Sequence, residues 1–185
     1  MKVVFVRHGK TDYALADARQ MSQLEKDYAP LQRACIPDIQ AQASHTLLQQ
    51  AEIILSSPYT RALQTAEILN RQLQKDLFVE HDLREWQADT KGSYIPLSER
   101  DRRWNEYREL FANGNEVTNA GYESATALHR RVSAVLDTYH AYSTIAVVAH
   151  FNVIEAIVGY REQGIEYGEM IEFDYQPIFK PSPQP

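Results

Sequence analysis

The stretch VVFVRHGKT, residues 3–11, begins as an apolar run and then changes character abruptly. Four apolar residues, Val3 to Val6, are followed at once by Arg7, His8 and Gly9. A short β-branched run that ends in polar and turn residues is typical of a buried strand. A cation and an imidazole therefore stand where the predicted strand ends. This position indicates a functional role if other segments of the chain supply partners.

Composition describes an ordinary globular chain with an excess of negative charge. The 185 residues are within the usual range for one domain. There are 19 Lys and Arg against 25 Asp and Glu, which gives a net charge of −6. This balance disfavours nucleic acid and membrane surfaces as partners, and no apolar run approaches the ~20 residues that span a bilayer. An anionic ligand would need a local cluster of positive charge.

The N-terminus and the cysteine usage favour a soluble protein of the cytoplasm. The apolar run stops at Arg7, so the sequence predicts no cleaved signal peptide. The single cysteine, Cys35, cannot form an internal disulfide, and metal-binding cysteine pairs are absent. We expect Cys35 to be inert.

Strand and helix patterns alternate along the chain. Buried strands are predicted at 2–8, 52–58 and 143–150, with weaker candidates at 77–83 and 168–175. Apolar residues at helical spacing predict helices in the segments 56–73, 122–142 and 151–159. Alternation of this kind predicts an α/β fold with a central, mostly parallel sheet between helical layers.

The domain organisation is predicted to be simple. Residues 1–175 read as a single catalytic domain, and the proline-rich end, 176–185, reads as a flexible tail. Residues 9–38 and 86–121 are less periodic and are expected to form surface excursions.

The carboxyl ends of the three predicted strands carry a distinctive set of side chains. Arg7 and His8 end the first strand, Ser57 ends the second with Arg61 one turn into the next helix, and His150 ends the third. Ligands of such sheets bind outside the carboxyl ends of the strands. Two guanidinium groups and two imidazoles beside a helix N-terminus would bind a doubly charged tetrahedral oxyanion, and a neutral imidazole can attack a bound phosphoryl group.

Three blocks of sequence, RHGKT (7–11), SSPYTRALQTA (56–66) and VVAHFNVIEAIVG (147–159), resemble the histidine phosphatase superfamily, the group of phosphoglycerate mutases and acid phosphatases. The blocks occur in the expected order and are spread across most of the chain. The resemblance implies a three-layer α/β/α fold like that of phosphoglycerate mutase. It also implies phosphoryl chemistry without a metal or other cofactor.

The resemblance implies a role for each matching residue. His8 would be the nucleophile that becomes phosphohistidine, and Arg7, Arg61 and His150 would bind the phosphate. Glu85, in the segment LREW, would protonate the leaving oxygen and then activate water.

The chain departs from the family pattern beside these residues. Phe151 and Asn152 follow His150 where many relatives have two glycines, and both are candidates for the substrate pocket. The segment after Glu85 also lacks the usual glycine and Trp-Glu-Gly, so Asp82 and Asp89 are reserve candidates for the acid.

The segment 98–110, SERDRRWNEYREL, has two interpretations. Its alternating charges favour a solvated helix. Alternatively, it forms a lid within the excursion 86–121, in which Arg102, Arg103 or Trp104 contacts the substrate. Tyr13 could line the entrance in the same way. The other histidines are expected to be structural or at the surface, since no metal-binding spacing joins them; they are His45, His81, His129 and His140.

These observations predict a metal-independent phosphatase that hydrolyses a phosphate monoester through phospho-His8. Its partner would be a small-molecule phosphate ester, or alternatively a phosphoprotein. Two other functions stay open. A mutase would transfer the phosphoryl group between positions of one substrate, although the chain is short for this. A binding module would capture a phosphorylated ligand without turnover.

Overall fold

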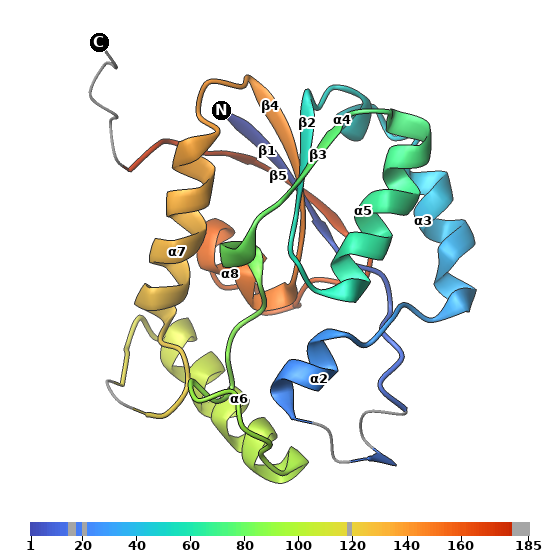
Figure 1. Ribbon diagram of the computed structural model, residues 1–185. Helices are drawn as coiled ribbons and strands as arrows, with labels where there is room; N and C mark the ends of the chain where they lie inside the picture. The colour runs from blue at the N-terminus through green and yellow to red at the C-terminus, as the bar shows by residue number, and fades with distance from the viewer. Residues whose placement is uncertain (15–17, 20–21, 118–119, 179–185) are drawn as a thin grey trace.

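The computed structural model describes residues 1–14, 18–19, 22–117 and 120–178 (Figure 1). Parts of the predicted excursions, 15–17, 20–21 and 118–119, and most of the predicted tail, 179–185, lie outside the described residues. The described strands are β1 (Lys2–Arg7), β2 (Ile53–Ser56), β3 (Asp76–Val79), β4 (Thr144–Ala149) and β5 (Met170–Asp174).

Helices connect these strands and flank the sheet. The α-helices are α2 (Gln23–Asp27), α3 (Ile36–Gln42), α4 (Thr46–Gln49), α5 (Thr60–Leu73), α6 (Leu97–Ala112), α7 (Ala125–Thr138) and α8 (Phe151–Val158). Two 3₁₀ helices are η1 (Arg33–Cys35) and η2 (His81–Leu83). None of the helices in the described part of the chain has the length and apolarity needed to cross a bilayer.

The five strands form one mixed sheet in the order β3-β2-β4-β1-β5. The first four strands run parallel, and β5 pairs antiparallel with β1 at one edge. The predicted α/β fold with a mostly parallel central sheet is confirmed. The weaker candidate 77–83 is only partly a strand, because residues 81–83 form η2.

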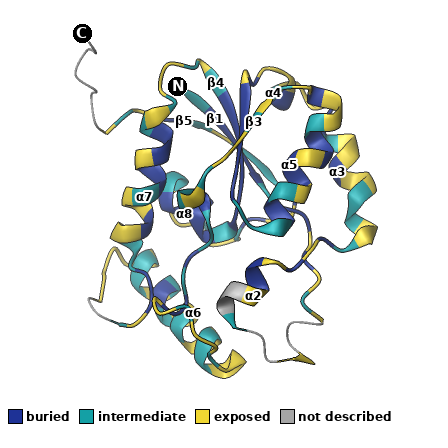
Figure 2. Ribbon diagram, viewed as in Figure 1, coloured by how far each residue is buried: buried dark blue, intermediate teal, exposed yellow. Residues whose placement is uncertain are grey.

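Both faces of the central strands are buried, which explains their continuous apolar runs. On β1, Val3 and Phe5 pack into the core cluster that includes α7 and α8, whereas Val4 and Val6 pack into the cluster that includes α3 and α5. The helices accordingly cover the sheet from both sides (Figure 1), and burial is concentrated between the layers (Figure 2). This is the expected α/β/α arrangement.

Helices α2 and α6 lie beyond the end of the sheet at which β1 and β4 finish (Figure 1). Helix α6 is attached to α8 through a buried ion pair between Arg108 and Glu155, whose side chain is fully buried. The Arg108 guanidinium also stacks on Tyr160, with 4.4 Å to the ring centroid, and on Phe151, with 4.9 Å. Breaking a buried ion pair costs about 3–5 kcal/mol, so these contacts hold α6 in place.

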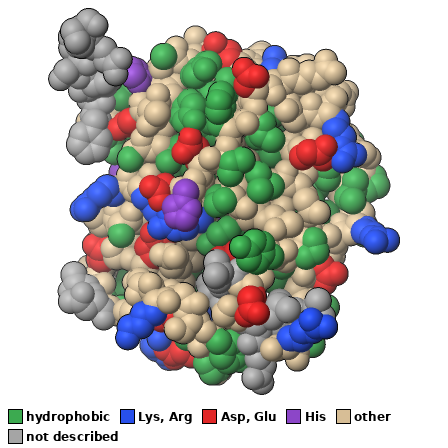
Figure 3. Space-filling view, in the orientation of Figure 1, with side chains coloured by type: hydrophobic (Ala, Val, Ile, Leu, Met, Phe, Trp, Pro, Cys, Tyr) green, Lys and Arg blue, Asp and Glu red, His purple; other side chains and the backbone are tan. Residues whose placement is uncertain are grey.

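Charges of both signs share the surface. On the face shown in Figure 3, Lys and Arg side chains are interspersed with Asp and Glu. The positive charge of the site described next is therefore a local feature of an acidic chain.

Gly9, directly after β1, lies in a space with no room for a side chain. An added Cβ would lie 2.6 Å from Cδ1 of the buried Ile39 and 3.0 Å from Sγ of Cys35. The backbone N–H of Gly9 also donates to Oγ1 of Thr65 at 3.1 Å. The turn after His8 is thus packed directly against α3 and α5.

We expect Gly9→Ala to lower the free energy of unfolding by about 1–3 kcal/mol, because the new methyl group overpacks this space. Denaturant unfolding followed by circular dichroism measures the change. Lys10→Ala, at the exposed neighbour, is the control and should change stability by less than about 0.5 kcal/mol. Equal stability of Gly9→Ala and the parent protein would contradict this reading of the packing.

Candidate active site

The sheet order brings the predicted phosphate-binding residues together. Strands β2, β4 and β1 are neighbours, so Ser57, His150 and His8 follow three adjacent carboxyl ends. Arg61, in the first turn of α5, directs its Nε at Nε2 of His8 over 3.2 Å. The rings of His8 and His150 are 4.9 Å apart between centroids.

The hydrogen bonds of His8 define its tautomer. Its Nδ1 lies 2.7 Å from the carbonyl oxygen of Gly9, which can only accept a hydrogen bond. Nε of Arg61 can only donate, so Nε2 of His8 must accept. His8 is therefore a neutral imidazole with the proton on Nδ1 and the lone pair on Nε2. Burial, followed by the charge of Arg61, lowers the pKa of His8 well below 6.5, so the ring stays neutral.

His150 is fully buried beside the same cation. Its Nε2 lies 2.7 Å from Oγ of Ser57, and the ring of Tyr59 is 5.1 Å away between centroids. Burial and then the charge of Arg61 lower the pKa of His150 well below its ordinary value. Its other ring nitrogen, Nδ1, has no hydrogen-bond partner among the described residues.

Arg7 is the last residue of β1, and its backbone N–H donates to the carbonyl oxygen of Glu169, just before the antiparallel strand β5, at 3.0 Å. Its Nη1 donates to the carbonyl oxygen of Ile165, and its guanidinium stacks on Tyr167 with 3.9 Å to the ring centroid. Like Nδ1 of His150, the buried Nε of Arg7 and Nη1 of Arg61 find no hydrogen-bond partner in the described part of the chain. Each such group costs about 1–3 kcal/mol when it is left unsatisfied, so the site is built to receive acceptor atoms.

A cavity of about 290 Å³ opens beside these residues. Five of the candidates from sequence line it: Tyr13, Arg61, Glu85, Trp104 and Asn152. The other lining residues are Lys26, Trp86, Ala88, Arg100 and Asp101. Of Arg7, His8, Arg61 and His150, only Arg61 is among the lining residues. Helix α6, for which a solvated helix and a lid were both predicted, contributes Arg100, Asp101 and Trp104 to the wall.

Two candidates from α6 lie elsewhere. Arg102 faces away from the cavity and pairs with Glu99 at 2.8 Å and with Glu106 at 3.0 Å. Arg103 pairs with Glu99 and with Asp89 and is not a lining residue. Of the arginines on this helix, Arg100 is the one that reaches the cavity, next to Asp101 at 3.5 Å.

Glu85 lies at the boundary between the cavity and the cationic group. Its Oε1 accepts a hydrogen bond from the backbone N–H of Trp86 at 2.7 Å. Burial is the largest influence and raises the pKa of Glu85, whereas the Trp86 N–H and the charges of Arg61 and Arg7 lower it. The raised pKa increases the protonated fraction, which suits a proton donor.

The two reserve candidates for the acid are not at the cavity. Asp82 forms an ion pair with Arg84, and Asp89 lies 3.3 Å from Nη1 of Arg103. Asp89 also accepts a hydrogen bond from the backbone N–H of Ser93 at 2.9 Å. Both carboxylates thus form ion pairs or hydrogen bonds with nearby residues and do not line the cavity.

The two residues after His150 have different environments. Phe151 turns away from the cavity and lies half-buried against Arg108, with Trp104 6.2 Å away between ring centroids. The buried Asn152 lines the cavity, and its Oδ1 has no partner among the described residues. The ring of Phe151 also lies against the guanidinium of Arg7, with 5.2 Å to the ring centroid, so the replacement of glycines here adds an aromatic contact to Arg7 and a polar group in the cavity.

Two residues at the site were not singled out from the sequence. Tyr59 contacts His150 from within the block 56–66, where attention went to Ser57 and Arg61, and Tyr167 contacts Arg7 from a segment without a recognisable motif. A weak signal for Tyr167 was available, since Gly164 (φ +75°) and Gly168 (φ +77°) mark tight turns on either side of it. No group of three or more metal-ligating side chains occurs within residues 1–14, 18–19, 22–117 and 120–178.

The fold and the cluster of arginine and histidine side chains are those expected of a phosphoryl-transfer protein, and the class is given by comparison with known families. Residues 3–178 match the histidine phosphatase superfamily (branch 1), and the chain belongs to this superfamily. The family resemblance seen in the sequence is confirmed. Membership supports phosphatase or related phosphoryl-transfer activity in general. A comparison with curated proteins gives no match.

Solved structures with the same fold include a mycobacterial glucosyl-3-phosphoglycerate phosphatase, 21% identical, with a TM-score of 0.69 over 92% of this chain and 88% of the other. Bacillus stearothermophilus YhfR is 16% identical, with a TM-score of 0.71 over 95% and 91% of the two chains. An Escherichia coli protein proposed as an alpha-ribazole-5'-P phosphatase is 21% identical, with a TM-score of 0.62 over 93% and 89%. These likenesses establish the phosphoglycerate mutase-like fold.

We expect His8 to stay neutral, with its proton on Nδ1, as the pH falls through 6.5, because its pKa lies well below that value. Nuclear magnetic resonance of ¹⁵N-labelled histidine between about pH 5 and 8 measures both the charge and the tautomer. His8→Gln identifies the signals that belong to His8. A ring that gains its proton near 6.5, or that carries its proton on Nε2, would contradict the proposed geometry.

Proposed function

We propose that this protein is a metal-independent phosphatase that hydrolyses a phosphate monoester through a phosphohistidine at Nε2 of His8. The observation that carries this proposal is the lone pair on Nε2, held beside Arg61 and next to buried donors of Arg7 and Arg61 that lack partners. Such donors match the oxygens of a phosphoryl group, and the lone pair matches its phosphorus. Family membership independently supports phosphoryl chemistry.

In the first step, Nε of Arg61 redirects its hydrogen bond from Nε2 of His8 to a phosphoryl oxygen, which frees the lone pair. Nε2 then attacks phosphorus and the ester P–O bond breaks. The leaving oxygen takes a proton from the carboxyl group of Glu85, which is one of the residues that line the cavity. Arg7, Arg61 and His150 bind the phosphoryl oxygens, and the two guanidinium groups stabilise the charge on them in the transition state. The products are an alcohol and phospho-His8, with Glu85 as carboxylate.

In the second step, water attacks phosphorus and the N–P bond breaks. Glu85 takes a proton from the water, which restores the acid, and His8 recovers its neutral ring. Inorganic phosphate then leaves. One carboxyl group thus serves as acid and as base in turn.

The size of the cavity supports a small-molecule phosphate ester as substrate. A volume of about 290 Å³ lies just below the usual range for small-molecule sites, about 300–1,000 Å³. Its wall combines aromatic side chains with Arg100 and Lys26, so the alcohol part would be compact and partly polar. We also propose a reducing compartment such as the cytoplasm, because Cys35 is the only cysteine of the chain.

We expect His8→Ala to reduce phosphate release from p-nitrophenyl phosphate by roughly 10³-fold or more, because it removes the nucleophile. The assay contains excess EDTA, and the control is His129→Ala, at an exposed histidine. Acid-labile, base-stable labelling by ³²P-phosphate ester should occur in the parent protein and be absent from His8→Ala. Full activity of His8→Ala, or loss of the parent activity in EDTA, would refute the mechanism. Phosphate binding without turnover would favour the binding module.

We expect Glu85→Gln to reduce kcat/KM for phenyl phosphate by roughly 10²–10⁴-fold, because phenoxide is a poor leaving group that needs a proton. For 2,4-dinitrophenyl phosphate, whose leaving group departs as a stable anion, kcat/KM should change little. Parallel assays of the two esters measure the difference. Equal losses with both esters would show that Glu85 is not the general acid.

A further inference from the structure

Glu85 is the residue of the proposed mechanism with the least support from regular structure. Residues 85–87 belong to neither a helix nor a strand, whereas His8 and His150 directly follow strands of the sheet. A general acid must keep its position within a fraction of an ångström of the leaving oxygen. Other contacts must therefore fix the backbone at Glu85.

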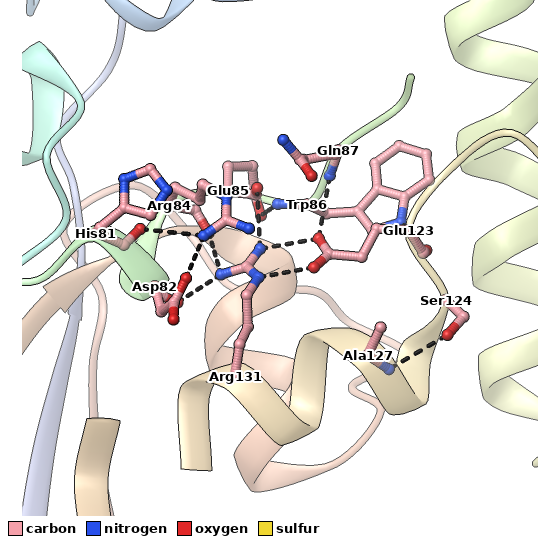
Figure 4. A network of polar contacts seen from close by, with 10 residues as sticks. All are labelled: His81, Asp82, Arg84, Glu85, Trp86, Gln87, Glu123, Ser124, Ala127 and Arg131. Atoms are coloured by element: carbon pink, nitrogen blue, oxygen red, sulfur yellow. Dashed lines mark hydrogen bonds and ion pairs between the residues drawn. The ribbon is translucent and has the colours of Figure 1, made fainter. Parts of the chain in front are cut away.

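The side chain of Arg131, from α7, makes those contacts (Figure 4). Its Nη1 donates to the carbonyl oxygen of Asp82 at 2.5 Å and to that of Arg84 at 2.8 Å. Its Nη2 donates to the carbonyl oxygen of Glu85 itself at 3.2 Å. One guanidinium thus binds three carbonyl groups within four residues.

Glu123 holds this guanidinium in place. Nε and Nη2 of Arg131 donate to the two carboxylate oxygens of Glu123 at 2.7 and 2.8 Å, a bidentate pair. The side chains are only 9% and 7% exposed, so the pair has a fixed geometry and little competition from water. The backbone of Glu123 also binds the two residues that follow Glu85. Its carbonyl oxygen accepts a hydrogen bond from Nε1 of Trp86 at 2.6 Å, and its N–H donates to the carbonyl oxygen of Gln87 at 2.9 Å.

The network acts on the carboxyl group of Glu85 through a short path. Arg131 fixes the carbonyl of the peptide that joins Glu85 to Trp86, and the N–H of that peptide donates to Oε1 of Glu85 at 2.7 Å. The orientation of one peptide plane therefore sets the direction of the carboxyl group. Arg131 is not among the residues that line the cavity.

We propose that Arg131, held by Glu123, is the positioning residue for the general acid Glu85. This inference rests on the proposed function, in which Glu85 protonates the leaving oxygen. Arg131 then affects the reaction chiefly where a proton must reach the leaving group. Its charge also acts on His150, and Arg131→Lys retains that charge. A residue with a merely structural role would affect all substrates equally, and this difference makes the proposal testable.

The experiment measures kcat/KM for phenyl phosphate and for 2,4-dinitrophenyl phosphate. This ratio of constants covers the steps up to the formation of phospho-His8, so it excludes the later attack of water. We expect Arg131→Ala to reduce kcat/KM for phenyl phosphate by about 10²-fold, the usual effect of a displacement near 1 Å, and to change that for the dinitrophenyl ester less than about threefold. Arg130→Ala, at the exposed neighbour on α7, is the matched control and should change neither.

Two further variants keep the test informative if Arg131→Ala fails to fold. Glu123→Gln retains Arg131 but removes the charge that orients it, and should show a smaller loss with the same selectivity for phenyl phosphate. Arg131→Lys keeps the positive charge but cannot bind three carbonyls and a bidentate carboxylate together, so it should also lose activity selectively. Thermal unfolding identifies which variants are folded.

The outcomes separate this inference from the proposed function. If Glu85→Gln loses phenyl phosphate activity selectively but folded variants of Arg131 and Glu123 lose both activities equally, Arg131 is not a positioning residue and the mechanism stands. If Glu85→Gln loses both activities equally, Glu85 is not the acid, and the role of Arg131 falls with it. Selective loss in all of these variants supports the inference.

Discussion

The contact between Nε of Arg61 and Nε2 of His8 is the interaction on which the site depends. It requires a neutral imidazole with its proton on Nδ1, and the carbonyl oxygen of Gly9 accepts the hydrogen bond from that N–H. The close packing at Gly9 then keeps the turn, and with it the ring, in one place. Arg61, the Nδ1–H tautomer of His8 and the turn at Gly9 depend on one another. If any one of them changed, a buried nitrogen of His8 or Arg61 would lose its hydrogen-bond partner.

Positive charge is concentrated at the site although the chain as a whole is acidic. An acidic chain repels a phosphate dianion at long range, but Arg7 and Arg61 stand together at the carboxyl edge of the sheet. Two buried histidines accompany them, and both have strongly lowered pKa values, so they add no charge of their own. The site therefore combines two fixed charges with two neutral rings, as the proposed mechanism requires of an anion-binding pocket that also contains a nucleophile.

Much of the fold could be predicted from the sequence, because strands buried on both faces have recognisable apolar runs, such as Val3 to Val6. The ends of these strands also predicted where Arg7, His8 and His150 would gather. The support for Glu85 could not be predicted in this way. Arg131 reaches carbonyl groups 46 to 49 positions away in the sequence, and carbonyl groups have no sequence signature. Similarly, Arg102 and Arg100 are two positions apart on α6, so only the rotation of the helix decides which one reaches the cavity.

The two ends of helix α6 make different contacts. Its later turns contain Arg108, which joins it to α8 through Glu155, whereas its earlier turns carry the cavity-lining Arg100, Asp101 and Trp104. The residue that attaches α6 to α8 is therefore different from the residues of α6 that line the cavity. Substitutions in the early turns can reshape the cavity while Arg7, His8, Arg61 and His150 and the attachment of the helix are retained. In a lineage of related enzymes, this arrangement would let substrate preference diverge quickly over an unchanged reaction centre.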